Sequence, residues 1–464
     1  MAEHDITRYG AVGDGVTLDT AAVQAAIDAA HADGGGTVTV PAGRTFLIGS
    51  IELRSQVELH VERGAVLQGS PHWAHYTARF KVGALSAGIV TESSDTSAAL
   101  LTARDAADIS ITGGGVIDGA GAAFAARGAG QRDDILVLSN ERPFLAFLLG
   151  CNNITVRDVT LRDSALWTLR LTGCQDVLIH GLRIRADVRM PNSDGIDIDR
   201  CRRVRISDCD IDTGDDGISL KTCDEWPEYG PCEDVTVTGC IISSRSSALV
   251  VGVDVSAPIR NVVFSSCVVR RSHRGLSVSA GTGSGGVIEN VLFSDMIVET
   301  QLYSEEWWGS GEPIFVRAAP WHAEVGRIRN IRFRNILARG EGGVVIYAHR
   351  PGLIDNVLLD GVRVELTRHT DRPGRRDLRP GAGGGPHPAV VPGIHVERAD
   401  QVVVHDCQIV WGGVHRASYG SAVVVVDSPD IDVAGLRGEA ARPDLPAVDN
   451  DASPSTAPRL RPAH

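Results

Sequence analysis

The sequence lacks the features of several protein classes. No run of about 18 apolar residues is present, which is the length that a transmembrane helix needs. The N-terminal stretch MAEHDITRYGAVGDG has no basic start followed by an apolar run, so we expect no signal peptide. Basic residues are not in excess, since 45 Lys and Arg face 58 Asp and Glu, a formal net charge of −13. We therefore expect no membrane or nucleic-acid partner, and a cytoplasmic location unless a leader has been removed.

Metal-binding patterns are also missing. The nine cysteines are scattered and odd in number, and no Cys-x-x-Cys pair or Cys/His cluster occurs. We predict that they are free, buried thiols, because unpaired cysteine packs as a small apolar residue. The sequence predicts no metal and no cofactor.

Helical periodicity is confined to one segment near the N-terminus. A helix is predicted over about 20–33, with Asp19 or Thr20 as its cap. Its apolar residues recur at i, i+3, i+4 and i+7, which predicts a buried face made of Val23, Ala26, Ile27 and Ala30.

A repeat of short alternating strands separated by polar turns follows this helix. In the middle of the chain its units begin at Ile154, Val177, Val204, Val235, Val262 and Val291, in steps of 23, 27, 31, 27 and 29 residues. Such a unit cannot bury its own apolar face, so units stack as coils and share one interior. A β-sandwich would have turns every 8–12 residues. We predict an all-β, right-handed parallel β-helix over residues 1–438, with the N-terminal helix as its cap.

Two segments lie outside the repeat. Residues 368–388 are rich in Arg, Gly and Pro and are predicted to form an excursion loop. Residues 439–464 are rich in Pro, Ala and Asp and are predicted to form a loose tail. We expect neither segment to be catalytic.

Three acidic residues fall together when the coils are aligned by their inward aliphatic residues. Asp194 and Asp216 each lie two positions before an aligned isoleucine, and Asp215 is next to Asp216. Three neighbouring carboxylates repel one another, so we expect at least one pKa to rise, which separates an acid from a base. The alternative is that these aspartates only cap turns.

At these residues the chain resembles glycoside hydrolase family 28, the polygalacturonase-like enzymes. The matching motifs are Asn192-Ser193-Asp194-Gly195 and Gly214-Asp215-Asp216-Gly217. GAVGDG near the N-terminus and GGGTVTVPAG at 34–43 are similar to the usual start of such β-helices. The resemblance implies hydrolysis of a glycosidic bond with inversion. It implies that Asp215 is the general acid, that Asp194 and Asp216 hold and deprotonate the attacking water, and that Asn192 lies beside the site.

The chain departs from this family pattern at two places. Where the polygalacturonases have Gly-His-Gly, this chain has Ser246-Ser247-Ala248, and where they have Arg-Ile-Lys it has Ser277-Val278-Ser279. Loss of that Arg and Lys removes charge-assisted contacts to a galacturonate carboxylate. We therefore expect a plant-type, pectin-related substrate other than plain polygalacturonate, with Ser247 and Ser277 beside it.

Further substrate-binding candidates lie near the aligned acids. Trp167 and Arg170 precede Asp194 by one coil and are candidates for a subsite. Lys221 is either a ligand of the substrate or the partner of Asp199.

The remaining candidates follow in later coils. His273 either replaces the missing histidine or is a surface residue. One of Trp307 and Trp308 offers an apolar face to a sugar ring, or covers the side of the coils. Glu312 falls in the acidic column and is a candidate to bind a sugar hydroxyl or to serve as an auxiliary acid.

Three functions remain open from the residues. The first is a glycoside hydrolase that acts on a carbohydrate. The second is a polysaccharide lyase or sugar transferase on the same scaffold, although a lyase needs a basic Arg or Lys to take the proton, and the serines at 277 and 279 argue against it. The third is a non-catalytic carbohydrate-binding β-helix.

Overall fold

The computed structural model describes most of the chain. The described residues are 2–81, 96–125, 135–136, 141–283, 285–321, 324–381, 384–413 and 418–450. They form two compact units. The first contains Met1–Ser219 and Cys223–Cys240, and the second contains Leu220–Thr222 and Ile241–His464.

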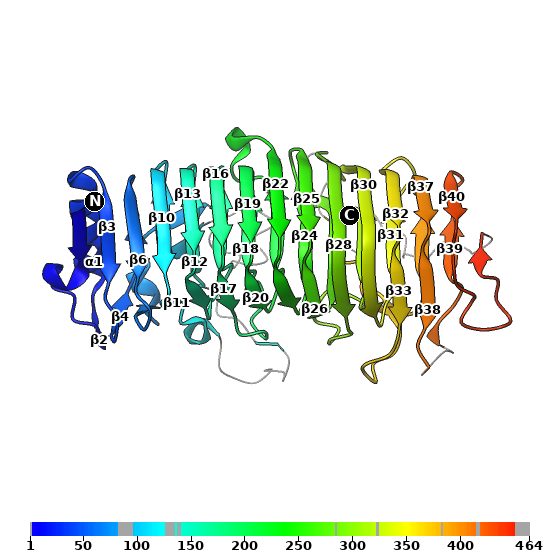
Figure 1. Cartoon of the computed structure of the whole chain (residues 1–464), viewed down its shortest axis with the longest axis horizontal. Coiled ribbons are helices and arrows are strands. Elements are labelled where there is room, and N and C mark those ends of the chain that lie inside the picture. The colour runs from blue at the N-terminus through cyan, green and yellow to red at the C-terminus, as the bar shows by residue number, and fades with distance from the viewer. Residues whose placement is uncertain are drawn as a thin grey trace, which may run out of the picture. The chain divides into compact units, whose positions relative to one another are not determined.

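In both units the chain is wound as a right-handed parallel β-helix, as predicted (Figure 1). Each turn of the winding contributes up to three short strands, and equivalent strands of successive coils pair in parallel. The coils are therefore joined by backbone hydrogen bonds, with neighbouring strands about 4.8 Å apart.

The first unit contains three parallel ladders. The first ladder is β1 (Ala2–Asp5), β3 (Gly36–Val40), β6 (Val57–Val61), β10 (Ala107–Gly113), β13 (Asn152–Arg157), β16 (Gln175–His180), β19 (Arg202–Ser207) and β22 (Cys232–Thr238). The second is β2 (Asp14–Leu18), β4 (Thr45–Ile48), β7 (Val66–Gly69), β11 (Val116–Asp118), β14 (Thr160–Arg162), β17 (Arg183–Arg185) and β20 (Asp210–Thr213). The third is β5 (Ile51–Glu52), β9 (Thr96–Arg104), β12 (Phe144–Leu149), β15 (Leu169–Thr172) and β18 (Ile196–Asp199), and β8 (Arg79–Lys81) pairs antiparallel with β9.

The second unit repeats this arrangement. Its first ladder is β25 (Ile259–Ser265), β28 (Val287–Thr300), β30 (Arg327–Gly340), β32 (Ile354–Asp360), β37 (Asp400–His405) and β40 (Ile431–Ala434). Its second is β23 (Ile241–Ser244), β26 (Val268–Ser272), the later halves of β28 and β30, β33 (Arg363–Leu366) and β38 (Gln408–Trp411). Its third is β24 (Ser247–Val255), β27 (Arg274–Thr282), β29 (Ile314–Ala318), β31 (Val344–Ala348), β36 (Ile394–Glu397), β39 (Val423–Val426) and β41 (Val448–Asp449). Short 3-10 helices connect elements of the first unit at η1 (Ile6–Tyr9), η2 (Trp73–His75), η4 (Gly121–Phe124) and η5 (Pro227–Tyr229).

The polar residue that precedes most repeat units forms the bend into the coil. It has a left-handed backbone with φ between 54° and 60° at Asn153, Asp176, Asp234, Asn261, Asn290, Asn330 and Asn356. Asn and Asp tolerate this conformation better than other non-glycine residues, which explains why they recur there. Arg203 (φ 55°) and Gln401 (φ 50°) adopt the same conformation in coils that have no Asn or Asp at this position.

The helix α1 (Thr20–Ala32) buries the face that its periodicity predicts, Val23, Ala26, Ile27 and Ala30. The prediction that Asp19 or Thr20 caps this helix is confirmed for the position of Asp19, but not for a capping bond from its side chain. Asp19 occupies the N-cap position, but its carboxylate accepts hydrogen bonds from the backbone N–H groups of Val12 (2.7 Å) and Gly13 (3.1 Å). The Thr20 hydroxyl accepts from Gly49 N–H. The two side chains therefore hydrogen-bond the loops at 12–13 and at 49 to the start of the helix.

The 368–388 segment, predicted as an excursion loop, leaves the three ladders and packs back against the second unit. It contains a short antiparallel pair, β34 (Arg375–Arg376) with β35 (His387–Pro388). Leu378 packs in an apolar cluster with Phe315 and Tyr347, which belong to β29 and β31. The buried carboxylate of Asp377 accepts a hydrogen bond from Gly309 N–H (2.8 Å). This segment therefore covers part of the third ladder of the second unit.

The described part of the C-terminal segment is attached to the last coil rather than loose. β41 pairs with β39, and the indole Nε1 of Trp411 donates to the carbonyl of Glu439 (2.8 Å). The outer edge of β39 would otherwise have unpaired backbone N–H and C=O groups, and pairing with β41 satisfies some of them. Residues 451–464 lie outside the described residues.

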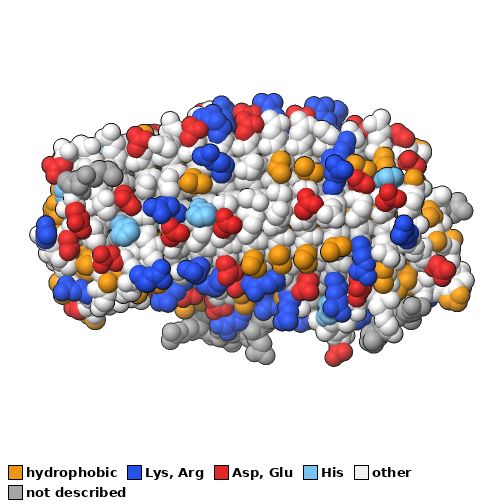
Figure 2. All heavy atoms as spheres, viewed as in Figure 1, with side chains coloured by type: hydrophobic (Ala, Val, Ile, Leu, Met, Phe, Trp, Pro, Cys, Tyr) orange, Lys and Arg blue, Asp and Glu red, His pale blue; other side chains and the backbone are white. Residues whose placement is uncertain are grey.

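All nine cysteines are free and buried, as predicted. No helix among the described residues is long and apolar enough to cross a membrane. On the face shown in Figure 2, basic and acidic side chains are interspersed.

Candidate active site

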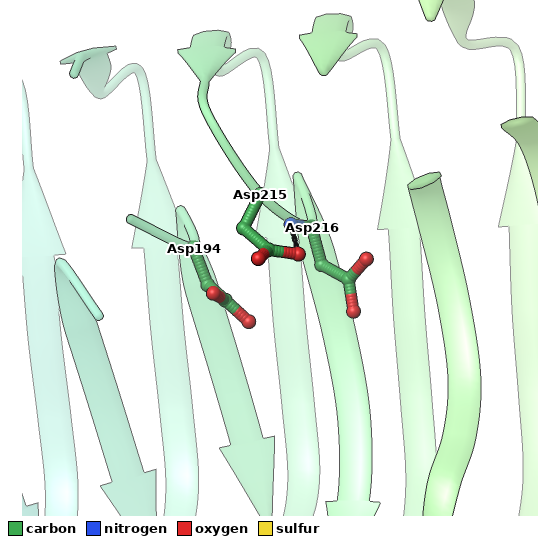
Figure 3. Close-up of side chains that lie close together, drawn as sticks. All are labelled: Asp194, Asp215 and Asp216. Carbon is green, nitrogen blue, oxygen red and sulfur yellow. Dashed lines mark hydrogen bonds between the residues drawn. The ribbon is translucent and has the colours of Figure 1, made fainter. Parts of the chain in front are cut away.

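The winding of the first unit brings Asp194, Asp215 and Asp216 together. The backbone N–H of Gly195 donates to the carbonyl of Asp216 (2.9 Å), and this bond holds the two acidic turns side by side. One carboxylate oxygen from each aspartate lies within 4.8 Å of the other two (Figure 3). Asp194 is buried, and the other two are half-buried. The predicted convergence of the three side chains is confirmed.

Two glycines allow this close approach. A Cβ on Gly195 would lie 2.4 Å from the carbonyl oxygen of Gly217, and one on Gly214 would lie 2.4 Å from that of Met190. Ser193 joins the same turns, because its hydroxyl donates to Met190 O (2.8 Å) and accepts from Gly214 N–H (3.1 Å). The glycines of both motifs therefore have a packing role beside the acids.

The carboxylate of Asp215 is held by two backbone donors. Its Oδ2 accepts a hydrogen bond from Asn192 N–H (3.1 Å), and its Oδ1 accepts one from Asp216 N–H (3.0 Å). The hydroxyl of Thr213 donates to the carbonyl of Asp215 (2.6 Å). Both the backbone and the carboxylate of Asp215 are thus oriented before any substrate binds.

Arg142 is a residue of this site that sequence reasoning missed. Its Nη2 donates to the side-chain oxygen of Asn192 (3.0 Å), so the Asn192 side chain faces this guanidinium. Burial lowers the pKa of Arg142 to about 10, while the charges of Asp194 and Asp215 raise it. No local pattern marks Arg142, because its partners lie more than 20 residues away in sequence.

Trp167 and Arg170 do not line an open subsite. Arg170 is 0% exposed, and its Nη2 forms ion pairs with Asp199 (3.0 Å) and Glu225 (3.5 Å). Burial lowers the pKa of Arg170, but Glu225 and Asp199 raise it above its ordinary value. Trp167 is buried against Phe144 in an aromatic cluster. An arginine on an outward strand position is held here by carboxylates of later coils, which the sequence alone does not reveal.

Lys221 is buried in β21 (Ile218–Thr222). The Asp199 carboxylate accepts hydrogen bonds from Arg170, Thr172 and the N–H of Cys223. Pairing of Lys221 with Asp199 stays a prediction.

His273 belongs to the second unit and is buried there, so the surface interpretation is wrong. Arg375 Nη2 lies 2.9 Å from His273 Nε2. Burial, and then the charge of Arg375, hold the pKa of His273 well below its ordinary value. His273 is therefore neutral and accepts a hydrogen bond from the segment that covers the third ladder.

The two tryptophans differ in exposure. Trp307 is buried, so its ring is not available as a plate for a sugar. Trp308 is half-buried and packs edge-to-face on Trp321, with ring centroids 5.3 Å apart. Glycines at 309 and 311, both with positive φ, let the chain turn between these rings and the next strand.

Glu312, Ser247 and Ser277 are also buried within the second unit. Glu312 Oε2 accepts a hydrogen bond from Ser310 N–H (2.6 Å) and lies 3.5 Å from Arg274 Nε. Burial raises the pKa of Glu312. Ser277 is paired with Phe315 of the next strand, and Phe315 belongs to the apolar cluster that includes Leu378. Ser247 and Ser277 therefore present no open surface to a sugar, and Glu312 lines only a small pocket together with Ser310 and Arg375.

Comparison with known proteins identifies the family. The model of the glycosyl hydrolases family 28 matches residues 35–304, which is more than half of the chain. This chain therefore belongs to glycosyl hydrolases family 28, as the two acidic motifs predicted.

Relatives and solved structures agree with this assignment. A probable polygalacturonase of Vitis vinifera is 31% identical over 313 residues, covering 65% of this chain and 62% of the relative. An exo-poly-alpha-D-galacturonosidase of Dickeya chrysanthemi is 26% identical, covering 62% of this chain and 54% of the relative. These matches span about half to three fifths of the relatives' length. The structure of an exopolygalacturonase from Thermotoga maritima has the same fold, with a TM-score of 0.64, 21% identity and coverage of 95% of this chain and 93% of that chain.

Proposed function

We propose that this protein is a glycoside hydrolase that cleaves a glycosidic bond in a pectin-related oligo- or polysaccharide. The observation that carries the proposal is the cluster of Asp194, Asp215 and Asp216, whose carboxylate oxygens lie within 4.8 Å of one another. Family membership and the polygalacturonases among the relatives support the same reaction class. The substrate partner is a carbohydrate.

In the proposed mechanism, Asp215 is the general acid. It gives its proton to the leaving glycosidic oxygen as the bond from that oxygen to the anomeric carbon breaks. Asp194 and Asp216 hold one water and remove its proton as the water oxygen bonds to the anomeric carbon. Exchange with solvent then restores the starting protonation of all three groups.

The stereochemistry is a separate part of the proposal. Two catalytic carboxyl groups about 5–5.5 Å apart are typical of retention, and about 6.5–9.5 Å leaves room for the water of an inverting enzyme. Here a third carboxylate is present. Asp194 and Asp216 can therefore hold the attacking water together, so that the water need not fit between the acid Asp215 and a single base. We therefore propose inversion, and NMR of the first-formed anomer tests it. A retained anomer would overturn this mechanism and make one aspartate a nucleophile.

The test of the catalytic residues is substitution of each aspartate by asparagine. We expect Asp194→Asn, Asp215→Asn and Asp216→Asn each to lower turnover at least about 100-fold, because each removes an acid or base group. Asp208→Asn is the matched control, since Asp208 is an exposed turn residue with φ of 56° that asparagine also tolerates. Full activity in any one of the three variants would remove that residue from the mechanism.

We also propose that plain polygalacturonate is a poor substrate. Ser277 and Ser279 stand where the family pattern has Arg and Lys, and both serines are buried. Without an Arg and a Lys at these positions, the site lacks charge-assisted contacts to a substrate that carries a carboxylate on every sugar, and such a substrate should bind less well. Comparison of kcat/KM for polygalacturonate and a panel of plant oligosaccharides tests this. Rapid cleavage of polygalacturonate would contradict it, and an ultraviolet-absorbing unsaturated product would indicate a lyase instead.

A further inference from the structure

Arg142 joins two turns of the first unit. It lies two residues before β12, is 2% exposed, and donates from Nη1 to the carbonyl oxygens of Ala165 (3.0 Å) and Pro191 (2.8 Å). Its Nη2 donates to the side-chain oxygen of Asn192 (3.0 Å). Ala165 lies on the turn before β15, and Pro191 and Asn192 lie on the turn before β18. One guanidinium therefore connects three successive coils.

The turn that Arg142 holds contains Asp194, a member of the acid cluster, and Asn192, whose backbone contacts a second member, Asp215. Asn192 N–H donates to Asp215 Oδ2, and Asp194 follows only two residues later. Asn192 has a left-handed backbone with φ of 56°, so its N–H direction depends on the turn keeping this shape. Any shift of the turn would move Asp194 and release Asp215.

The charge of Arg142 acts on the same group of side chains. Asp194 and Asp215 interact electrostatically with its buried guanidinium. The other charged side chains of the 187–195 segment are Asp187 and Arg189, which are paired with each other (2.7 Å) and so contribute little net charge. A cation held in a poorly solvated place offsets the mutual repulsion of neighbouring carboxylates.

We propose that Arg142 is a positioning residue of the proposed active site, which fixes the 191–194 turn and offsets the negative charge of the aspartate cluster. It acts through Asn192 and Asp215 and does not contact the substrate. The proposal rests on the proposed function for its kinetic consequences, but its geometric part does not.

Two substitutions separate the two roles of the guanidinium. Arg142→Gln removes the charge and most of the donors, so we expect kcat to fall about 10- to 100-fold with KM changed less than threefold, because misplacement of catalytic groups is costly. Without the positive charge the carboxylates protonate more easily, so the acid limb of the pH profile should move to higher pH. Arg142→Lys keeps the charge but cannot donate to three separate acceptors. It should keep the acid limb in place and still lose kcat.

The matched control is Arg203→Gln. Arg203 also pairs with an aspartate in this unit, Asp176, but it is exposed on another ladder. We expect wild-type kcat and pH profile for this variant. Wild-type kinetics and profile in Arg142→Gln would overturn the proposal, as would a kcat loss in Arg203→Gln of the same size.

A measurement without substrate keeps this test independent of the proposed function. In protein with 13C-labelled aspartate carboxyl groups, the resonances of Asp194 and Asp215, assigned with the asparagine variants, should titrate at higher pH in Arg142→Gln than in the wild type and Arg142→Lys. An unchanged titration would overturn the charge role. If the wild type hydrolyses no glycan while the titration shifts, the proposed function fails and the inference on Arg142 stands. Where circular dichroism shows Arg142→Gln to be unfolded, kcat of Arg142→Lys decides the positioning role, and a wild-type kcat in that variant would overturn the proposal.

Discussion

At the scale of residues, buried charges in this protein follow two patterns. Some are neutralised by a defined partner, as Arg170 is by Asp199 and Glu225. Others lose their charge, as His273 does beside Arg375. Both outcomes follow from the cost of keeping an ion in a poorly solvated place.

The neutral His273 predicts a pH dependence of stability. Its pKa is lowered in the folded protein by burial and by Arg375, so below about pH 6.5 the unfolded chain takes up a proton that the folded one refuses. The contribution of neutral His273 to the free energy of unfolding is fully present above about pH 6.5. As the pH falls below this value, the contribution decreases by up to about 1.4 kcal/mol per pH unit. Urea unfolding at a series of pH values measures it. His273→Gln should flatten the slope between pH 7 and 5, and an unchanged slope would contradict this assignment.

At the scale of elements, aromatic side chains from neighbouring coils stack inside the second unit. Phe264, Phe293 and Phe333 lie on β25, β28 and β30, with ring centroids 4.7 Å and 5.0 Å apart and nearly parallel planes. The parallel register places them opposite one another on successive strands. Removal of the central ring would leave a cavity with phenylalanines on both sides.

We expect Phe293→Ala to lower the free energy of unfolding by about 3–5 kcal/mol, because it combines lost burial with that cavity. Ile297→Ala is the control, since Ile297 lies on the same strand β28 but is 49% exposed. Denaturant unfolding should show a change within about 0.5 kcal/mol for the control. Equal losses in the two variants would mean that the inward and outward positions of β28 do not differ in energy.

The third ladder of the second unit contains a buried arginine, Arg317, which lacks the ion pairs that stabilise the charge of Arg170. Arg317 on β29 is 1% exposed, and its Nε and Nη1 atoms have no hydrogen-bond partner in the described chain. Burial, and then the charge of Arg274, lower the pKa of Arg317 to about 9. Its Nη2 donates to the carbonyl oxygen of Pro380, and Asp377 offsets part of the desolvation from a distance, but the guanidinium forms no ion pair with a carboxylate of the described residues.

We expect Arg317→Met to raise the free energy of unfolding by about 1–4 kcal/mol, as replacement of buried charges by apolar residues of similar volume often does. Arg170→Met is the contrasting variant. It leaves Asp199 and Glu225 buried without their cation and should cost about 3–5 kcal/mol. Thermal and urea unfolding measure both, and destabilisation by Arg317→Met would show that the guanidinium has a favourable partner in solution.

At the scale of the whole molecule, the nine cysteines report on the integrity of the coils. All are buried and free, and they are spread from Cys151 to Cys407. Burial protects a thiol from reagents. Desolvation also raises the pKa of Cys232 to about 12 and that of Cys407 to about 11, whereas a hydrogen bond with Cys240 lowers the pKa of Cys209.

We therefore expect a thiol reagent such as DTNB to label less than one cysteine per native chain and all nine in denaturant. Dithiothreitol should leave the Tm unchanged, because the structure contains no disulfide among these residues. Rapid labelling of several native thiols would show that coils open readily, and a Tm lowered by reductant would contradict the free-thiol assignment.

The amino-acid sequence by itself determined the type of fold, the capping helix, the family and the convergence of Asp194, Asp215 and Asp216. These follow from periodicity and from motifs that recur once per coil, because stacked coils place equivalent positions on top of one another. Only the tertiary structure decided the surroundings of the outward side chains. The contacts that bury Arg170 and His273, that hold the 368–388 segment on the second unit and that fix Arg142 join residues from 23 to more than 100 positions apart in sequence. A buried charge is stable only with its distant partners in place, and a single sequence does not show which of those partners the winding brings near.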